Sequence, residues 1–126
     1  MNQFNQIPEN DNKQRIIQEI VPGKQITLAH IIANPNKILY RKLGLNPDID
    51  YAKAAIGVVT MSPAEYAIIA ADLAMKNSDS ELGFVDRFSG TLIITGTLAD
   101  VESAVRAVME YAEAHLGFTV CALTKT

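Results

Sequence analysis

The sequence predicts a single α+β domain in which helices cover one face of a mainly antiparallel sheet. Its 126 residues are an ordinary length for one domain and are enough to enclose one core. Hydrophobic residues make up 48% of the chain, aromatic residues 6%, and Trp is absent, which favours a core of Ala, Ile, Leu and Val. Short apolar runs of strand length alternate with segments of helical periodicity.

The N-terminal part divides at about residue 14. Residues 1–13 are polar, contain Pro8 and show neither strand nor helix periodicity, so we expect a disordered tail without a signal peptide or membrane anchor. A β-branched run at 14–22 ends at the turn dipeptide Pro22-Gly23 and is followed by a second run, Gln25–Ile32. Two strands joined by a tight turn are the expected result.

A short helix should follow, because Asn34-Pro35 supplies an N-cap and a proline at the first helical position, while Gly44 suits a helix C-terminus. After a linker, Ala54–Met61 is an apolar run rich in Ile and Val. Its lack of alternation predicts a strand that is buried on both faces.

The segment Ser62-Pro63-Ala64-Glu65 has the pattern of a capping box with Pro at the first helical position, and it predicts an Ala-rich helix that ends near Asn77. The small face of this helix suits either subunit packing or the monomer core. Beyond it the signals predict strands at Glu81–Phe88 and Thr91–Thr95, an amphipathic helix from Thr97 to His115, and a last strand at Phe118–Leu123.

Composition and motifs argue against several function classes. A net charge of −3 with no basic stripe disfavours nucleic-acid binding. Cys121 is the single cysteine and reads as a small buried hydrophobe in a cytosolic protein. Ser89 lacks the flanking glycine of a nucleophile elbow, and neither His30 nor His115 has a second ligand at metal spacing. We therefore expect no enzyme activity, catalytic residue, metal or cofactor.

The Asp86-Arg87-Phe88 segment is unusual, because opposite charges and an aromatic ring occupy a tight connection between two strands where Asn or Gly is common. From the residues alone, the simplest interpretation is a local salt bridge on a solvated loop.

Four segments carry a family resemblance: IIQEIVPGKQITLAHIIANP, AIGVVTMSP, ELGFVDRFSG and the closing CALTKT. Together they resemble the circularly permuted bacterial microcompartment (BMC) shell proteins of the EutS and PduU type. The resemblance extends from Arg15 to Thr126, which is nearly the whole chain.

The resemblance implies a permuted, ferredoxin-like BMC domain at 23–126, with its last strand and helix moved to the front. The strand at 14–22 would enter a six-stranded β-barrel over the axis of a cyclic homohexamer; its residues are Arg15, Ile16, Ile17, Gln18, Glu19, Ile20 and Val21. The loop Asp86, Arg87, Phe88, Ser89 and Gly90 would point toward that axis. Asp72 and Lys76 would lie at the hexamer edge.

The implied function is structural: a tile of a microcompartment shell, within the cytoplasm, that helps to retain aldehyde intermediates. Its partners would be copies of itself, other shell proteins and cargo enzymes, with no nucleic acid and no membrane. Ser89 and Thr124-Lys125 favour the ethanolamine type over the propanediol type. Two alternatives remain: a ferredoxin-like regulatory domain that binds a metabolite, and an enzyme that uses Asp86, Arg87 or His30.

Overall fold

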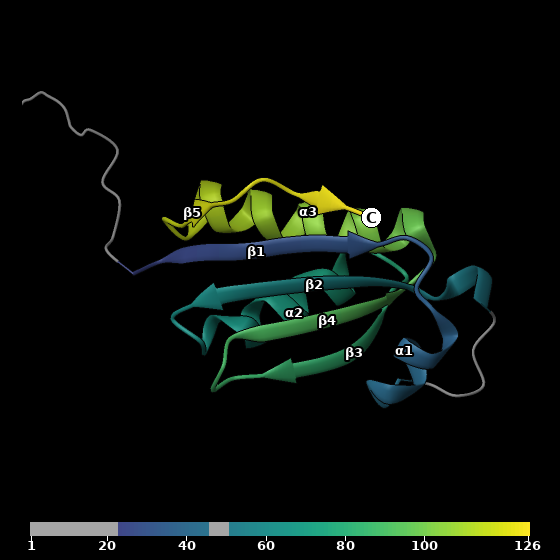
Figure 1. The fold of residues 1–126 in the computed structure, drawn as a ribbon. Helices are drawn as coiled ribbons and strands as arrows, with labels where there is room; N and C mark the ends of the chain where they lie inside the picture. Colours follow the sequence, from purple (N-terminus) through teal and green to yellow (C-terminus); the bar gives the residue numbers. More distant parts are fainter. Residues whose placement is uncertain (1–22, 46–50) are drawn as a thin grey trace, which may run out of the picture.

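A computed structural model describes residues 23–45 and 51–126. The expected polar tail (1–13) and the expected first strand (14–22) lie outside the described residues. Within them, six strands form one sheet in the order β3, β4, β2, β1, β5, with β6 also paired to β1 (Figure 1). No helix of the described part of the chain is long and apolar enough to cross a membrane.

The central strands confirm the expected antiparallel sheet. Four strands pair antiparallel with one another: β1 (Gln25–Ile32), β2 (Ala55–Ser62), β3 (Glu81–Asp86) and β4 (Thr91–Gly96). The single final strand predicted at Phe118–Leu123 is wrong. Two short pieces, β5 (Thr119–Val120) and β6 (Thr124–Lys125), instead run parallel to β1. The gap between them lies opposite an irregularity in β1 between Ile26 and Leu28, where regular pairing is lost.

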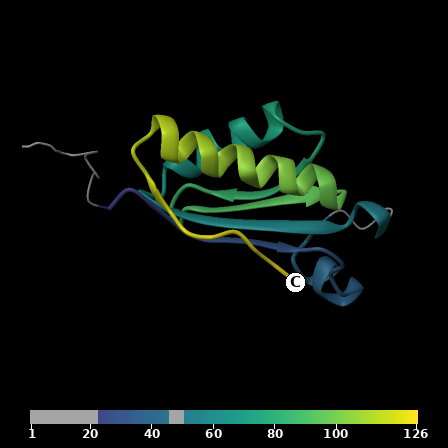
Figure 2. The ribbon, with the colours of Figure 1, turned by 90° about the horizontal axis from the view of Figure 1, so that it is seen from above.

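Two helices, α2 (Tyr66–Lys76) and α3 (Leu98–His115), cover one face of the sheet (Figure 2). α2 buries only alanines, namely Ala67, Ala70, Ala71 and Ala74. These small side chains let the helix lie close to its neighbours, so its Ala-rich face belongs to the monomer core. α3 also lies close to the sheet, because a Cβ added at Gly57 would be 2.8 Å from Val101 Cγ1.

A 3₁₀ turn, η2 (Tyr51–Lys53), precedes β2, and α1 (Lys37–Lys42) corrects the expectation that all helices share one face. Tyr40 of α1 packs with Leu45, Ala54 and Ile56 in a separate small cluster. In Figure 2, α1 lies on the opposite side of the sheet from α2 and α3. Because Ala55 and Ile56 point to opposite faces, β2 is buried on both, as its apolar run predicts.

Both proline-based predictions of helix starts are wrong. α1 is capped by Asn36, whose Oδ1 accepts the Ile38 N–H at 2.8 Å, so Asn34-Pro35 precedes the helix. Ser62 pairs with Gln25 as the last residue of β2, and α2 begins only after Glu65, which makes no side-chain cap. Ser62 does not occupy the N-cap position, because Glu65 and not Ser62 directly precedes Tyr66, the first residue of α2. Thr97 does cap α3, accepting the Asp100 N–H at 3.1 Å.

Candidate functional site

The connection between β3 and β4 is a turn organised by Asp86. One carboxylate oxygen accepts the Phe88 N–H at 2.8 Å and the other accepts the Ser89 hydroxyl at 2.9 Å. The Gly90 N–H donates to the Asp86 carbonyl at 2.9 Å. The Phe88 N–H and then the Ser89 hydroxyl hold the pKa of Asp86 below its ordinary value. The carboxylate is therefore a structural acceptor within the turn.

Gly90 attaches this turn to the end of β2. Its φ is 76°, and an added Cβ would lie 2.1 Å from the Met61 carbonyl oxygen. The Gly90 carbonyl accepts the Met61 N–H at 2.9 Å. Since the blocking atom belongs to the backbone, no side chain at position 90 fits without moving β2.

Arg87 and Phe88 form the exposed tip of the turn. The Arg87 guanidinium carbon lies 5.0 Å from the centroid of the Phe88 ring, and Phe88 is 81% exposed. The expected local salt bridge does not form between Asp86 and Arg87. The Asp86 carboxylate bonds to Phe88 and Ser89 instead. The tip thus presents a cation and an aromatic ring outward, and both groups can contact another molecule.

Asp72 and Lys76 lie one turn apart on the exposed side of α2. They belong to a different element from the β3–β4 turn. Their charged groups are 2.8 Å apart, with side chains 58% and 70% exposed, respectively. Hydrogen bonding to Asp72 raises the pKa of Lys76. A pair this exposed adds little to stability, so Lys76 keeps the freedom to exchange Asp72 for another partner.

The candidate nucleophiles and metal ligands do not assemble into a site. The ring nitrogens of His30 contact the hydroxyls of Thr124 and Thr126, and the His115 ring lies 4.8 Å from that of Tyr111. Cys121 is half-buried against the core, less enclosed than its sequence context predicts. Across residues 23–45 and 51–126, no group of three His, Cys, Asp or Glu side chains could hold a metal ion.

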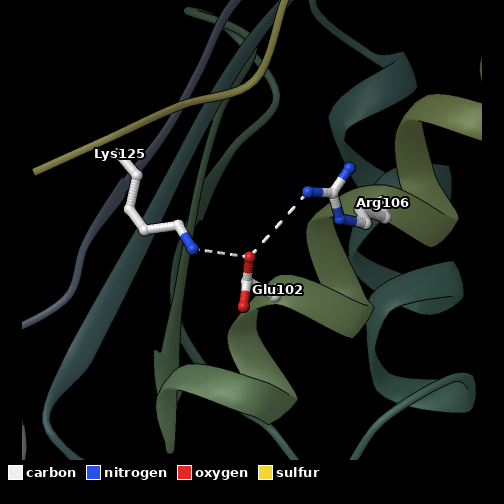
Figure 3. A network of polar contacts seen from close by, with 3 residues as sticks. All are labelled: Glu102, Arg106 and Lys125. Atoms are coloured by element: carbon white, nitrogen blue, oxygen red, sulfur yellow. Dashed lines mark hydrogen bonds and ion pairs between the residues drawn. The ribbon is translucent and has the colours of Figure 1, made fainter.

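A second polar arrangement holds the C-terminal segment, and the sequence gives no signal for it. Glu102 of α3 contacts Lys125 of β6 at 2.8 Å and Arg106 at 3.8 Å (Figure 3). The hydrogen bond from Lys125 keeps the pKa of Glu102 below its ordinary value. Together with His30 and the bond from Thr126 N–H to the Ile31 carbonyl at 2.9 Å, it fixes the chain end beside β1.

Comparison with known proteins identifies the family of this chain. The profile of the BMC domain matches residues 55–123. The shell protein EutS of Salmonella typhimurium is 52% identical over 91% of this chain and 99% of its own length. This chain belongs to the BMC-domain family of bacterial microcompartment shell proteins. PduU of the same organism is 48% identical, covering 89% of this chain and 93% of that protein.

Solved structures agree. The flat hexamer of the shell protein CutR superimposes with a TM-score of 0.76 at 46% identity, covering 90% of this chain and all of that one. A screw form of CutR gives a TM-score of 0.75 at 44% identity, covering 83% of this chain and all of that one. The prediction of a shell protein, located in the microcompartment shell within the cytoplasm, is confirmed.

Proposed function

We propose that this chain is a non-catalytic tile of an ethanolamine-type microcompartment shell, where it forms a cyclic homohexamer and helps to retain aldehyde intermediates. The observation that carries the proposal is the 52% identity to EutS over nearly the whole chain, against 48% to PduU. The flat hexameric relative supports the cyclic assembly. Other shell proteins and cargo enzymes are its further partners in this proposal.

The hexamer has a direct test. Light scattering should give the mass of six chains, and electron microscopy should show flat arrays at high protein concentration. A monodisperse monomer or dimer at micromolar concentration would contradict the proposal.

The pathway needs a separate experiment, because both relatives are shell proteins. We would co-express a fluorescent fusion of this chain with a complete ethanolamine-type shell and, in parallel, with a complete propanediol-type shell. Preferential incorporation into the first is expected. Equal incorporation into both, or preference for the second, would show that the ethanolamine assignment is wrong.

The permuted arrangement is part of the same proposal. The BMC profile begins at residue 55 and so omits β1 and α1, yet β1 pairs with β2 along its whole length. A permutation that moved the last strand and helix to the front, within 23–126, would account for both facts. The segment 14–22, through Arg15–Val21, would then supply one strand of a barrel over the six-fold axis. Six such strands closed into a barrel leave no exposed strand edge.

Removing residues 1–22 tests the barrel. The truncated protein should remain a hexamer by native mass spectrometry, while averaged electron micrographs should show an open axis. Dissociation into monomers would instead make this segment the main oligomer contact.

We place the turn Asp86–Gly90 at the axis in this assembly. The turn is internally bonded and tied to β2, and Arg87 and Phe88 extend from it into solvent. Phe88→Ala should leave the hexamer mass unchanged and alter only the density at the axis. A loss of hexamers in this variant would assign Phe88 to a subunit interface instead.

At the tile edge we place Asp72 and Lys76. Lys76→Glu should weaken array formation without changing the hexamer mass, since it leaves the internal contacts of the chain in place and repels Asp72 only at the surface. Lys53→Glu, another exposed lysine, is the matched control. Arrays of normal order from Lys76→Glu would show that Lys76 is simply a solvated residue at the helix end.

A further inference from the structure

Charge is unevenly distributed along the chain. From Gly23 to Leu45 there are four basic residues and no acidic one, so the rest of the chain carries −7 within a total of −3. Three of the four, Lys37, Arg41 and Lys42, belong to α1. A six-residue helix therefore has a local charge opposite to that of the molecule.

The same helix exposes large apolar side chains. Ile38 is 63% exposed, Leu39 is 40% exposed, and Leu43, which caps the helix, is 46% exposed. Only Tyr40 of the helix is buried against the sheet. Arg41 and Lys42 are exposed, and neither has an acidic partner in the described ranges. Exposed aliphatic groups beside unpaired cations characterise a contact surface for an apolar, acidic partner.

A surface with the complementary character lies on the opposite side of the sheet. A groove of about 290 Å³ runs between α2 and α3, with Leu73, Ala107 and Ala114 as apolar lining and Tyr111 and Glu110 among its other residues. Tyr111 is 40% exposed. Of the neighbouring cations, Arg106 contacts Glu102 and Lys76 contacts Asp72. Glu110 and the nearby exposed Glu113 have no ion-pair partner among the described residues.

We propose that α1 of one copy docks into the groove between α2 and α3 of a second copy. Ile38 would enter the apolar part of the groove, and Arg41 and Lys42 would approach Glu110 and Glu113. The contact involves only two surfaces of this chain and does not depend on the hexamer proposed above.

The contact can form only between molecules. α1 and the groove lie on opposite faces of the sheet (Figure 2), so the helix cannot reach the groove of its own chain. Because two different surfaces meet, the contact is heterologous and stacks two sheets face to back. A helix of six residues buries little area, so the contact is weak and depends on salt and on high local concentration.

Carbodiimide cross-linking tests the contact, because this reagent joins an amine directly to a carboxylate. Equal amounts of ¹⁴N- and ¹⁵N-labelled chains are mixed at low salt and cross-linked, and peptides joining Lys42 to Glu110 are identified by mass spectrometry. Mixed-isotope pairs are expected in the wild type. Lys42→Glu and Glu110→Lys, each used alone, should abolish this cross-link, because each variant removes one of its two reactive groups and places like charges at the contact.

Mixing the two variants provides the decisive step. Lys42→Glu places a carboxylate opposite Glu110, and Glu110→Lys places an ammonium group opposite Lys42, so at this pair of positions either variant repels itself and attracts the other. Mixed-isotope cross-links should therefore return, now also joining the new carboxylate at position 42 of one variant to the new amine at position 110 of the other. Circular dichroism checks that both variants are folded, which is expected because both side chains are exposed.

Absence of mixed-isotope pairs in the wild type, or failure of the two mixed variants to give cross-links between positions 42 and 110, would overturn the proposal. Light scattering on the same samples separates it from the proposed hexamer. Hexamers without this cross-link would refute only the docking of α1, and the cross-link without hexamers would refute only the cyclic tile.

Discussion

The two faces of the sheet are closed by very different amounts of structure. On one face, α2 and α3 bury a continuous core that reaches from β1 to β4. On the other, α1 and Leu45 cover a small cluster around Ile56 at one end of the sheet. Leu28 and Phe84 lie on this second face, as their cross-strand partners do. Their side chains remain 42% and 47% exposed, respectively.

This difference indicates that the two faces have different tasks. The face with two helices supplies the stability of the monomer, because apolar burial is its main source. The face with α1 leaves apolar surface that a shell assembly can use, since large exposed patches mark contact sites. Substitutions matched across the two faces can test this division.

The largest expected difference is between Ile94→Ala and Ile56→Ala. Both side chains are completely buried, Ile94 under the two helices and Ile56 under α1. We expect a loss of about 4 kcal/mol in the free energy of unfolding for Ile94→Ala, because the surrounding core cannot collapse into the cavity, and about 2 kcal/mol for Ile56→Ala. Urea unfolding at one fixed protein concentration measures both values. Equal losses would refute the distinction between the faces.

A matched pair of glycines gives a smaller effect. A Cβ at Gly57 would lie 2.8 Å from Val101 and 3.0 Å from Val105, two short branched side chains held in α3. At Gly83 the nearest atom, at 2.9 Å, is the end of the Leu45 side chain. Gly57→Ala should cost about 2 kcal/mol and Gly83→Ala about 1 kcal/mol, because the terminal methyl of Leu45 can shift further than the short valines, and Ile93, at 3.2 Å, needs to move only slightly. The reverse order in urea unfolding would show that the α1 side is the more tightly packed.

Cys121 tests how far the core under the helices extends beyond the sheet. Its half-buried side chain packs against that core from the segment between β5 and β6. Cys121→Ala should lower the free energy of unfolding by about 1 kcal/mol and leave assembly unchanged. Reaction of the native thiol with a maleimide should be slower than in urea. Equal labelling rates would mean that the segment does not stay on the core.

The smallest effect concerns the pH dependence of the contact between Glu102 and Lys125. The Lys125 ammonium lowers the pKa of Glu102 in the folded chain. Its contribution is therefore complete above the pKa of the unfolded carboxyl group and is lost as the pH falls through the lower folded pKa. Melting temperatures of the wild type and Lys125→Met should differ slightly at neutral pH and converge in acid. A difference that persists in strong acid would exclude this contact as its source.

Local signals in the sequence predicted most of the helices and central strands of this protein, because these signals lie among neighbouring residues. The apolar run at Ala54–Met61, the Ala-rich segment before Asn77 and the cap at Thr97 all lie where their patterns predict a strand or a helix. The motifs that resemble the shell-protein family were also readable directly, and the comparisons confirm the family.

Tertiary contacts decided the rest. Ser62 remains in β2 because it pairs with Gln25, which is 37 positions away, and this overrides its local capping pattern. α1 leaves the face of the other helices because Tyr40 is buried beside Ile56, and Gly90 is required because its Cβ would meet the backbone at Met61. Such effects depend on atoms that are distant in sequence and close in space. A pattern of neighbouring residues therefore cannot predict them.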